Sequence, residues 1–143
     1  MAVREIVKDP DFLSQKSEVF IFRDDKHIIQ DMLDTAEAHR ENCAGLAAIQ
    51  IGEPKKIILV RMNDKFVPFI NPHIIKKSPG TYCTMEGCLS IDGQRSVKRH
   101  HTIMVAYTTA KGKFVHKQFS GNVAQIIQHE VDHLNGILIG KEV

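Results

Sequence analysis

The chain has 143 residues, of which 43% are hydrophobic and 25% charged, and its formal net charge is +2. These values are typical of one globular domain with its own core, and so weak a positive charge does not favour a nucleic-acid surface. No apolar run reaches the length of a membrane span, and the N-terminus "MAVREIVKDPDF" is not a secretory signal. We therefore expect one cytoplasmic, monomeric domain over residues 1–143, without nucleic-acid or membrane partners.

The first half of the chain predicts a helix and a β-hairpin. Residues 24–42 open with acids suited to a helix N-terminus, and apolar residues then recur at helical spacing, namely Ile28, Ile29, Met32, Leu33 and Ala36. The segment 42–54 is expected to be irregular. The segments 56–62 and 65–71 flank Asn63-Asp64 and are typical of a hairpin.

The second half predicts another hairpin and a second helix. Residues 78–94 are expected to be irregular, whereas 101–108 and 113–119 flank "TAKG" and favour a hairpin. Residues 122–135 form the second helix, with Ser120 or Asn122 as its cap and Gly136 as a left-handed end. This helix is apolar around most of its circumference, on positions Val123, Ile126, Ile127, Val131 and Leu134. Strands surrounding one buried helix indicate an α+β fold.

The second helix carries a metal-binding pattern. His129, Glu130 and His133 form HExxH, in which the i, i+4 spacing brings two imidazoles onto one stripe able to hold a single ion. Glu130 then reaches a metal-bound water without binding the metal itself. Asp132 is expected to pair outside the site, as a partner of a metal-binding residue.

A catalytic site needs a third protein ligand and one position left for water. Spacing does not choose among the candidates, which are Cys43, Cys83, Cys88, Glu86, His73, His100, His101 and His116. "EGCLS" (86–90) is suggestive, because Gly87 lets the backbone approach closely and Cys88 lies in an irregular segment. The three cysteines are odd in number and lack CxxC spacing, so a disulfide framework is not expected.

Three segments together resemble the motifs of bacterial peptide deformylase. They are "GLAAIQIG" (45–52), "EGCLS" (86–90) and "QHEVDHLNG" (128–136), and the resemblance extends over nearly the whole chain. It implies antiparallel strands wrapped around the HExxH helix, with an amphipathic helix towards the N-terminus. It also implies hydrolysis of the N-formyl group of N-formylmethionyl nascent peptides, with release of formate.

The resemblance assigns a role to each site residue. Cys88, His129 and His133 would hold the metal, and Glu130 would be the general acid/base. Gln50 and the backbone N–H of Leu89 would stabilise the oxyanion. The residues expected to bind substrate are Gly45, Ala44, Arg95, Gly87 and Ile126, with Ile126, Leu89 and Ala44 lining an apolar slot for the methionine side chain.

The resemblance also implies one divalent metal ion. Fe(II) is the expected native ion, and Zn(II), Ni(II) or Co(II) are expected to be possible in purified protein, because one thiolate and two imidazoles suit all of these. The sequence does not choose among them.

Several positions depart from the family pattern. Cys43 replaces a common glycine, and Asp92 replaces a common proline. Asn122 and Gln125 fall on helix positions that are often apolar, near the expected methionine slot, and we favour N-cap and capping-box roles for them. Many relatives continue past "GKEV" (140–143) into a C-terminal helix implicated in ribosome docking, so docking by that route is not expected here.

Two other functions compete with deformylation. One is a small HExxH metallopeptidase, although such enzymes usually take His or Glu as the third ligand. The other is a non-catalytic, metal-binding relative, which would have no need of Glu130 or Gln50. Formate release from a formylated peptide separates deformylation from both.

Overall fold

The computed structural model describes residues 2–139, and these form an α+β fold with antiparallel sheets, as the sequence predicts. The segment "GKEV" (140–143), on which the expectation about a C-terminal helix rests, lies outside the described residues. The helices are α1 (Pro10–Leu13), α2 (Phe22–Ala38) and α3 (Gly121–Leu134), with short 3-10 turns η1 (Arg40–Asn42) and η2 (Ala48–Ile51). The strands are β1 (Gly45–Ala47), β2 (Ile57–Met62), β3 (Lys65–Lys77), β4 (Thr81–Cys88), β5 (Ile91–His100), β6 (Thr102–Thr108) and β7 (Phe114–Ser120).

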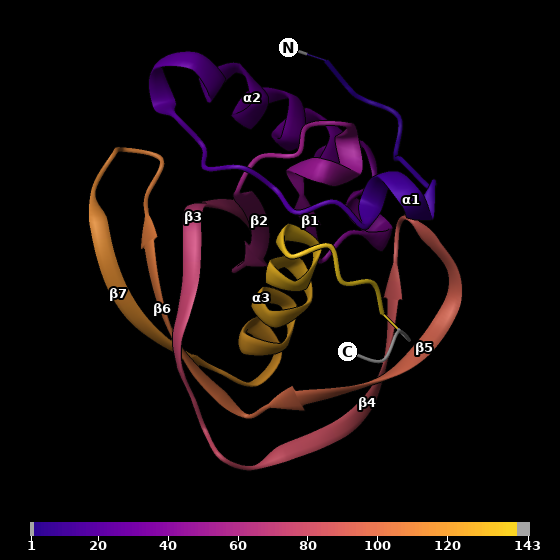
Figure 1. Ribbon diagram of the computed structural model, residues 1–143, viewed down its shortest axis with the longest axis vertical. Coiled ribbons are helices and arrows are strands. Elements are labelled where there is room, and N and C mark those ends of the chain that lie inside the picture. The colour runs from indigo at the N-terminus through magenta and orange to yellow at the C-terminus, as the bar shows by residue number, and fades with distance from the viewer. Residues whose placement is uncertain (1, 140–143) are drawn as a thin grey trace.

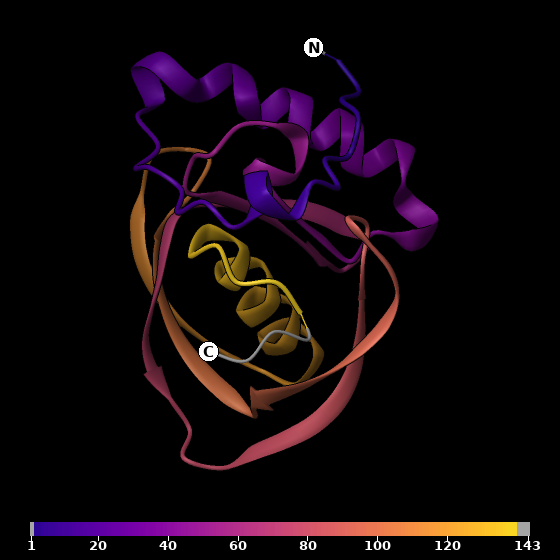
Figure 2. The ribbon, with the colours of Figure 1, turned by 45° about the vertical axis from the view of Figure 1, so that its right-hand side comes forward.

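The strands form two antiparallel sheets around α3. One sheet has the order β1-β2-β3-β6-β7, and the other is the β4-β5 hairpin. α3 packs against β1, β2, β5, β6 and β7. Figures 1 and 2 show α3 in the interior, with strands on several sides and α2 lying across the outside of β1–β3. Within residues 2–139, no helix is both long and apolar enough to cross a lipid bilayer.

Strand β2 is covered on both faces, which places a core on each side of it. Ile58 and Val60 belong to the cluster around α3, whereas Ile57 and Leu59 belong to the cluster under α2. Because alternate side chains point to opposite faces of a sheet, a strand buried on both faces is apolar at every position. This explains the continuous run "IILV" and ties the two cores into one unit.

The two hairpins expected from the sequence are present. Asn63 and Asp64 both have positive φ, of 50° and 66°, as a two-residue type I′ turn requires. β3 continues to Lys77, well past the predicted end at residue 71, and its pairing with β6 shifts register between Ile70 and His73. That shift allows Pro72, which lacks an N–H, to lie within the strand.

The prediction that residues 78–94 are irregular is wrong. β4 and β5 form a hairpin there, and only Leu89 and Ser90 lie between them. A strand usually points its apolar side chains inward and its polar ones outward. Here the order is reversed, because Met85 faces outward, at 54% exposure, and Glu86 faces inward. The segment 42–54 is also more regular than expected, since it contains β1 and η2.

Helix α3 corresponds to the predicted helix over 122–135, but its first turn differs. Ser120 is at the N-cap position and makes no capping hydrogen bond with its side chain. The capping roles expected for Asn122 and Gln125 are wrong, because Asn122 already lies inside the helix and Gln125 Oε1 accepts from Tyr82 instead. The helix ends as predicted, since Gly136 has a φ of 76°.

Candidate metal centre and active site

Three side chains from two elements converge at the C-terminal half of α3. The ligand atoms of Cys88, His129 and His133 all lie within 4.8 Å of one another, and no other such group occurs among residues 2–139. The histidines come from one stripe of α3, and Cys88 comes from the end of β4. The β4–β5 register shifts between Gly87 and Cys88. Such a bulge changes the direction of the side chain that follows it, which brings the thiol to the helix.

Hydrogen bonds set which ring nitrogen of each histidine faces this group. His129 Nδ1 is 2.7 Å from Glu86 Oε1, so its Nε2 is directed towards the cluster. His133 Nε2 lies 3.4 Å from Cys88 Sγ. Both rings therefore offer Nε2, while the opposite nitrogen of His129 is held by a carboxylate, as is common for metal-binding histidines.

Glu86 connects His129 to a buried ion-pair chain. The Arg99 guanidinium grips Glu86 in a fork, with Nη2 at 2.6 Å from Oε1 and Nε at 2.9 Å from Oε2. Its Nη1 is 2.9 Å from Asp132 Oδ2. The structure thus places Asp132 outside the ligand group. Glu86, a candidate ligand by sequence, is bonded to a ligand residue instead.

The electrostatics of this chain keep Glu86 ionised. Burial tends to raise the pKa of Glu86, but hydrogen bonds from Arg99 and His129 outweigh burial and lower it to about 2. Glu130 lacks such partners, and its burial raises its pKa to about 7. The two neighbouring carboxyl groups are therefore driven in opposite directions by their surroundings.

The pKa values of the two imidazoles also differ. Burial lowers the pKa of His133 to about 3, with the charges of His129 and Arg99 adding to the effect. At His129 burial acts in the same direction, but the nearby Glu130, Cys88 and Glu86 outweigh burial and raise the pKa above its ordinary value. Their surroundings therefore shift the pKa values of the two imidazoles in opposite directions.

The residues present fit a divalent cation. Glu130 Oε1 is buried and has no hydrogen-bond partner in the described part of the chain, which is costly unless a ligand or water satisfies it. One thiol and two imidazoles are the donor set of a catalytic zinc or iron site with a free coordination position. The family residues and the geometry agree on this ligand group.

Gln50 is held beside the cluster by η2. Its Oε1 accepts from the backbone N–H of Ala47 at 2.9 Å. Its Nε2 lies 3.1 Å from Ser90 Oγ and 3.4 Å from Cys88 Sγ. The amide is 1% exposed and directs its donor towards the sulfur, so its orientation is fixed before any substrate enters.

Gly45 leaves room for Glu130. A Cβ at position 45 would lie 2.8 Å from Glu130 Oε2 and 2.8 Å from Ile126 Cγ2, closer than real Cβ atoms approach. Position 87 has no such steric requirement for glycine, because the atom nearest to a Cβ built there would be Gly93 O, at 3.8 Å. The close backbone approach predicted at Gly87 occurs at Gly45 instead.

A cavity of about 230 Å³ opens onto these groups. Its walls include most of the predicted site residues, namely Ala44, Gly45, Gln50, Gly87, Cys88, Leu89, Ile126, His129 and Glu130. Arg95 is not among the lining residues, and its Nη1 donates to the carbonyls of Asp92 and Gln94. Sequence reasoning missed Asn42 and Met85 as lining residues, since neither belongs to a motif.

The structure places three of the positions that depart from the family pattern. Cys43 is 3% exposed and packs in the cluster beneath α2, and burial raises the pKa of its thiol to about 12. Asn122 and Gln125 both line the cavity. The expected apolar slot is therefore bordered by two carboxamides as well as by Ile126.

Comparisons with known proteins agree with this geometry. Residues 3–143 match the family model described as polypeptide deformylase. A peptide deformylase of Clostridium beijerinckii is 45% identical over 137 residues, which are 96% of this chain and 99% of that protein. The actinonin-bound crystal structure of class I type b peptide deformylase from Acinetobacter baumannii superposes with a TM-score of 0.89 at 32% identity, covering 100% of this chain and 99% of that one.

A further structure of the Acinetobacter baumannii enzyme, with Met-Ala-Ser bound, gives a TM-score of 0.87 at 31% identity and covers 99% of both chains. The similarity therefore extends from the motifs to the entire fold and over 99% of each of these three chains. The chain belongs to the polypeptide deformylase family.

Proposed function

We propose that this protein hydrolyses the N-formyl group of N-formylmethionyl nascent peptides in the cytoplasm, releasing formate and a free amine. The observation that carries the proposal is the meeting of Cys88, His129 and His133 beside a cavity. Cys88 and His129 line this cavity, together with Glu130 and Gln50. A solved relative holds Met-Ala-Ser, the kind of peptide that deformylation leaves behind. A scaffold without activity would not need a buried Glu130 at this place.

Cys88, His129 and His133 would hold one divalent ion, and Fe(II) is the native metal that we propose. When bound there, such an ion lowers the pKa of water towards 7 and polarises a carbonyl oxygen. Zn(II), Ni(II) or Co(II) would also suit one thiolate and two imidazoles. Glu86 would orient His129 and raise its basicity as a ligand.

Glu130 would carry the proton. It follows the first histidine on α3, lines the cavity and has one buried oxygen without a partner. In this position it would accept a proton from the attacking water and deliver it to the leaving nitrogen, which cannot depart as an anion. Because Gly45 has no side chain, it would leave room for the Glu130 carboxylate beside the substrate backbone.

Gln50 and the backbone N–H of Leu89 would stabilise the charge that develops on the formyl oxygen. Both residues line the cavity, and the Gln50 amide is held in place by Ala47 and Ser90. One such preorganised donor typically contributes about 3 kcal/mol in the transition state. Ala44, Gly87 and Ile126 would contact the peptide, whereas Arg95 would reach it only by leaving its present hydrogen bonds.

We also propose that residues 1–143 act as one catalytic domain and as a monomer. The cores on either side of β2 share this strand, so the HExxH helix and α2 would not function apart.

The test is release of formate from N-formyl-Met-Ala-Ser by protein purified anaerobically and loaded with Fe(II). We expect formate from the formylated peptide and no peptide-bond cleavage of the unformylated one. Cleavage without formate would instead indicate a metallopeptidase.

The matched variant is Glu130→Gln, which keeps the shape of the side chain and removes the proton carrier. We expect full metal content by elemental analysis and a fall in kcat of about 10²–10⁴ or more. Undiminished turnover in this variant would refute the role of Glu130.

A further inference from the structure

The cavity has two chemically different ends. The residues of α3 that line it are Asn122, Gln125, Ile126, His129 and Glu130, which follow one side of the helix. Gln125 lies four residues before His129, or about 6 Å along the helix axis. The metal-ligand group therefore borders one end, and two carboxamides border the other. A substrate whose formyl group meets the metal-ligand group would direct its first side chain towards the carboxamide end.

Gln125 is held in one orientation by β4. The Tyr82 hydroxyl donates to Gln125 Oε1 at 3.0 Å. The Tyr82 ring in turn packs on His101, with 4.7 Å between ring centroids, so the hydroxyl is itself positioned. With its oxygen engaged, the Gln125 amide has two N–H donors left, and these make no hydrogen bond to a residue in the range 2–139.

An N–H donor at a binding surface discriminates between side chains of equal length. A substrate group that accepts a hydrogen bond compensates the donor for the water that it loses, and a hydrocarbon group does not. The sulfur of methionine is a weak acceptor, the oxygen of methionine sulfoxide is a strong one, and norleucine has none at that position. The three side chains differ little in length, so they isolate this one property.

We propose that Gln125 determines the specificity of this deformylase for the first substrate residue, favouring N-formyl peptides whose first side chain ends in a hydrogen-bond acceptor. Tyr82 is the positioning residue, because it acts through Gln125. The inference rests on the proposed function and deepens it. It predicts that formylated methionine sulfoxide is a better substrate than formylated norleucine.

The test compares kcat/KM for N-formyl-methionyl, N-formyl-norleucyl and N-formyl-methionine-sulfoxide versions of one Xaa-Ala-Ser peptide. In the wild-type protein we expect the sulfoxide to exceed norleucine by about fivefold or more, the effect of one neutral hydrogen bond. Gln125→Leu should reverse the order, mainly through KM, since the contact is present before and during the reaction. Tyr82→Phe should lower the preference without reversing it.

The control is Gln118→Leu, which changes an exposed glutamine of β7 away from the cavity and should leave the preference unchanged. Circular dichroism and metal content establish that each variant is folded and loaded. Equal preference in wild type and Gln125→Leu would overturn the inference. If no peptide releases formate, the proposed function fails, and binding of the unformylated peptides by calorimetry still decides this inference. Tighter binding of the sulfoxide peptide than of the norleucyl one supports it, and equal affinity refutes it.

Discussion

Glu86→Gln tests whether the buried ion-pair chain supports the metal site. Glu86 accepts three hydrogen bonds at 2.6, 2.7 and 2.9 Å, two from Arg99 and one from His129. Glutamine keeps one acceptor oxygen and replaces the other with an NH₂ group. Whichever way the amide turns, at least one donor of Arg99 or His129 then faces another donor. Arg99 keeps only Asp132 as a charged partner.

The expected cost follows from these contacts. Removing one partner of a buried ion pair costs about 3–5 kcal/mol, and the remaining amide oxygen and Asp132 offset part of it. We therefore expect the free energy of unfolding of the metal-free protein to fall by about 3 kcal/mol. Because His129 also loses the carboxylate that orients it, metal affinity should fall by about 10- to 100-fold.

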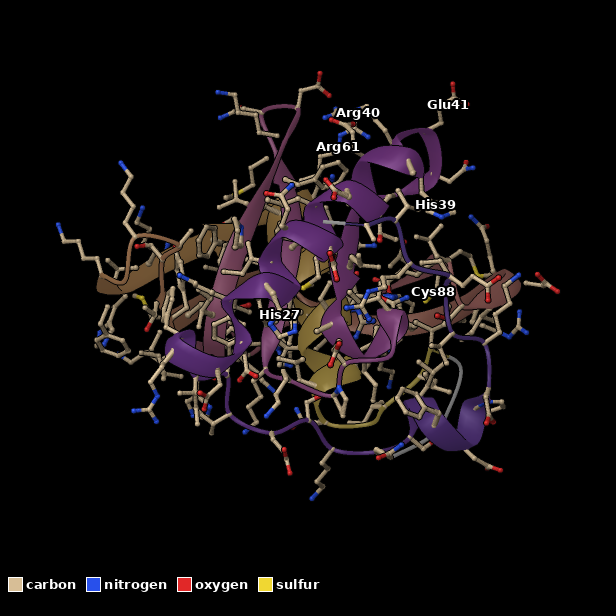
Figure 3. The ribbon with its side chains drawn as sticks, turned by 90° about the horizontal axis from the view of Figure 1, so that it is seen from above. His27, His39, Arg40, Glu41, Arg61 and Cys88 are labelled. Atoms are coloured by element: carbon tan, nitrogen blue, oxygen red, sulfur yellow. The ribbon has the colours of Figure 1, made fainter. Side chains whose placement is uncertain are left out.

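Two measurements check these values. Urea denaturation of the metal-free protein, followed by circular dichroism, gives the change in stability, and competition for Co(II) with a coloured chelator gives the metal Kd. Arg40 lies close to Arg61 and away from Cys88 (Figure 3). Because Glu37 pairs with Arg40 on the exposed surface, Glu37→Gln is the matched control. It should leave both quantities nearly unchanged. A Glu86→Gln protein with a wild-type metal Kd would refute the reasoning.

Three other outcomes are expected. Gly45→Ala introduces a methyl group 2.8 Å from Glu130 and Ile126. The free energy of unfolding, measured by urea denaturation, should fall by about 1–3 kcal/mol, and kcat should fall by about 100-fold. An unchanged kcat would show that Glu130 has room to move. Burial tends to raise the pKa of Asp31, but hydrogen bonds from Arg4 and the backbone outweigh it and lower the pKa from 3.8 to about 2. The ionised form is therefore stabilised by folding, and this contribution is present above pH 4 and lost as pH falls towards 2. Because Arg4 is 31% exposed, Asp31→Asn should cost only about 1 kcal/mol at pH 7. The cost should be smaller at pH 2, where about half of the native Asp31 is protonated, and an equal cost at both pH values would contradict the shift. Removing the metal with a chelator should lower Tm reversibly. The loss should correspond to about 4 kcal/mol if the free metal concentration had been about a thousand times the Kd. A Tm independent of metal would argue against a specific site.

Some of the site could be anticipated because the signal is local. The i, i+4 spacing of His129 and His133 needs only one helix to become a shared stripe, and the Asn63-Asp64 turn needs only two residues with positive φ. The choice of Cys88 among several candidate ligands is different. It depends on the β4–β5 register shift, and the sequence supplied it only through resemblance to a family.

The β4–β5 hairpin was missed for a physical reason. Strand prediction relies on apolar residues that point towards a core, but the inward face of β4 meets the polar side of α3 and carries Tyr82 and Glu86. The same contact overturned the capping role of Gln125, because a partner distant in sequence competes with a local one.

The sequence by itself determined the two long helices, two of the hairpins, the α+β class and the paired histidines, because each depends on neighbours a few residues apart. Only the tertiary structure decided that Glu86 and Arg99 support His129 and that Gly45 leaves room for Glu130. The same holds for the carboxamides of Asn122 and Gln125, which border the cavity. Those relations join residues on different elements, and they exist only once antiparallel strands have closed around α3.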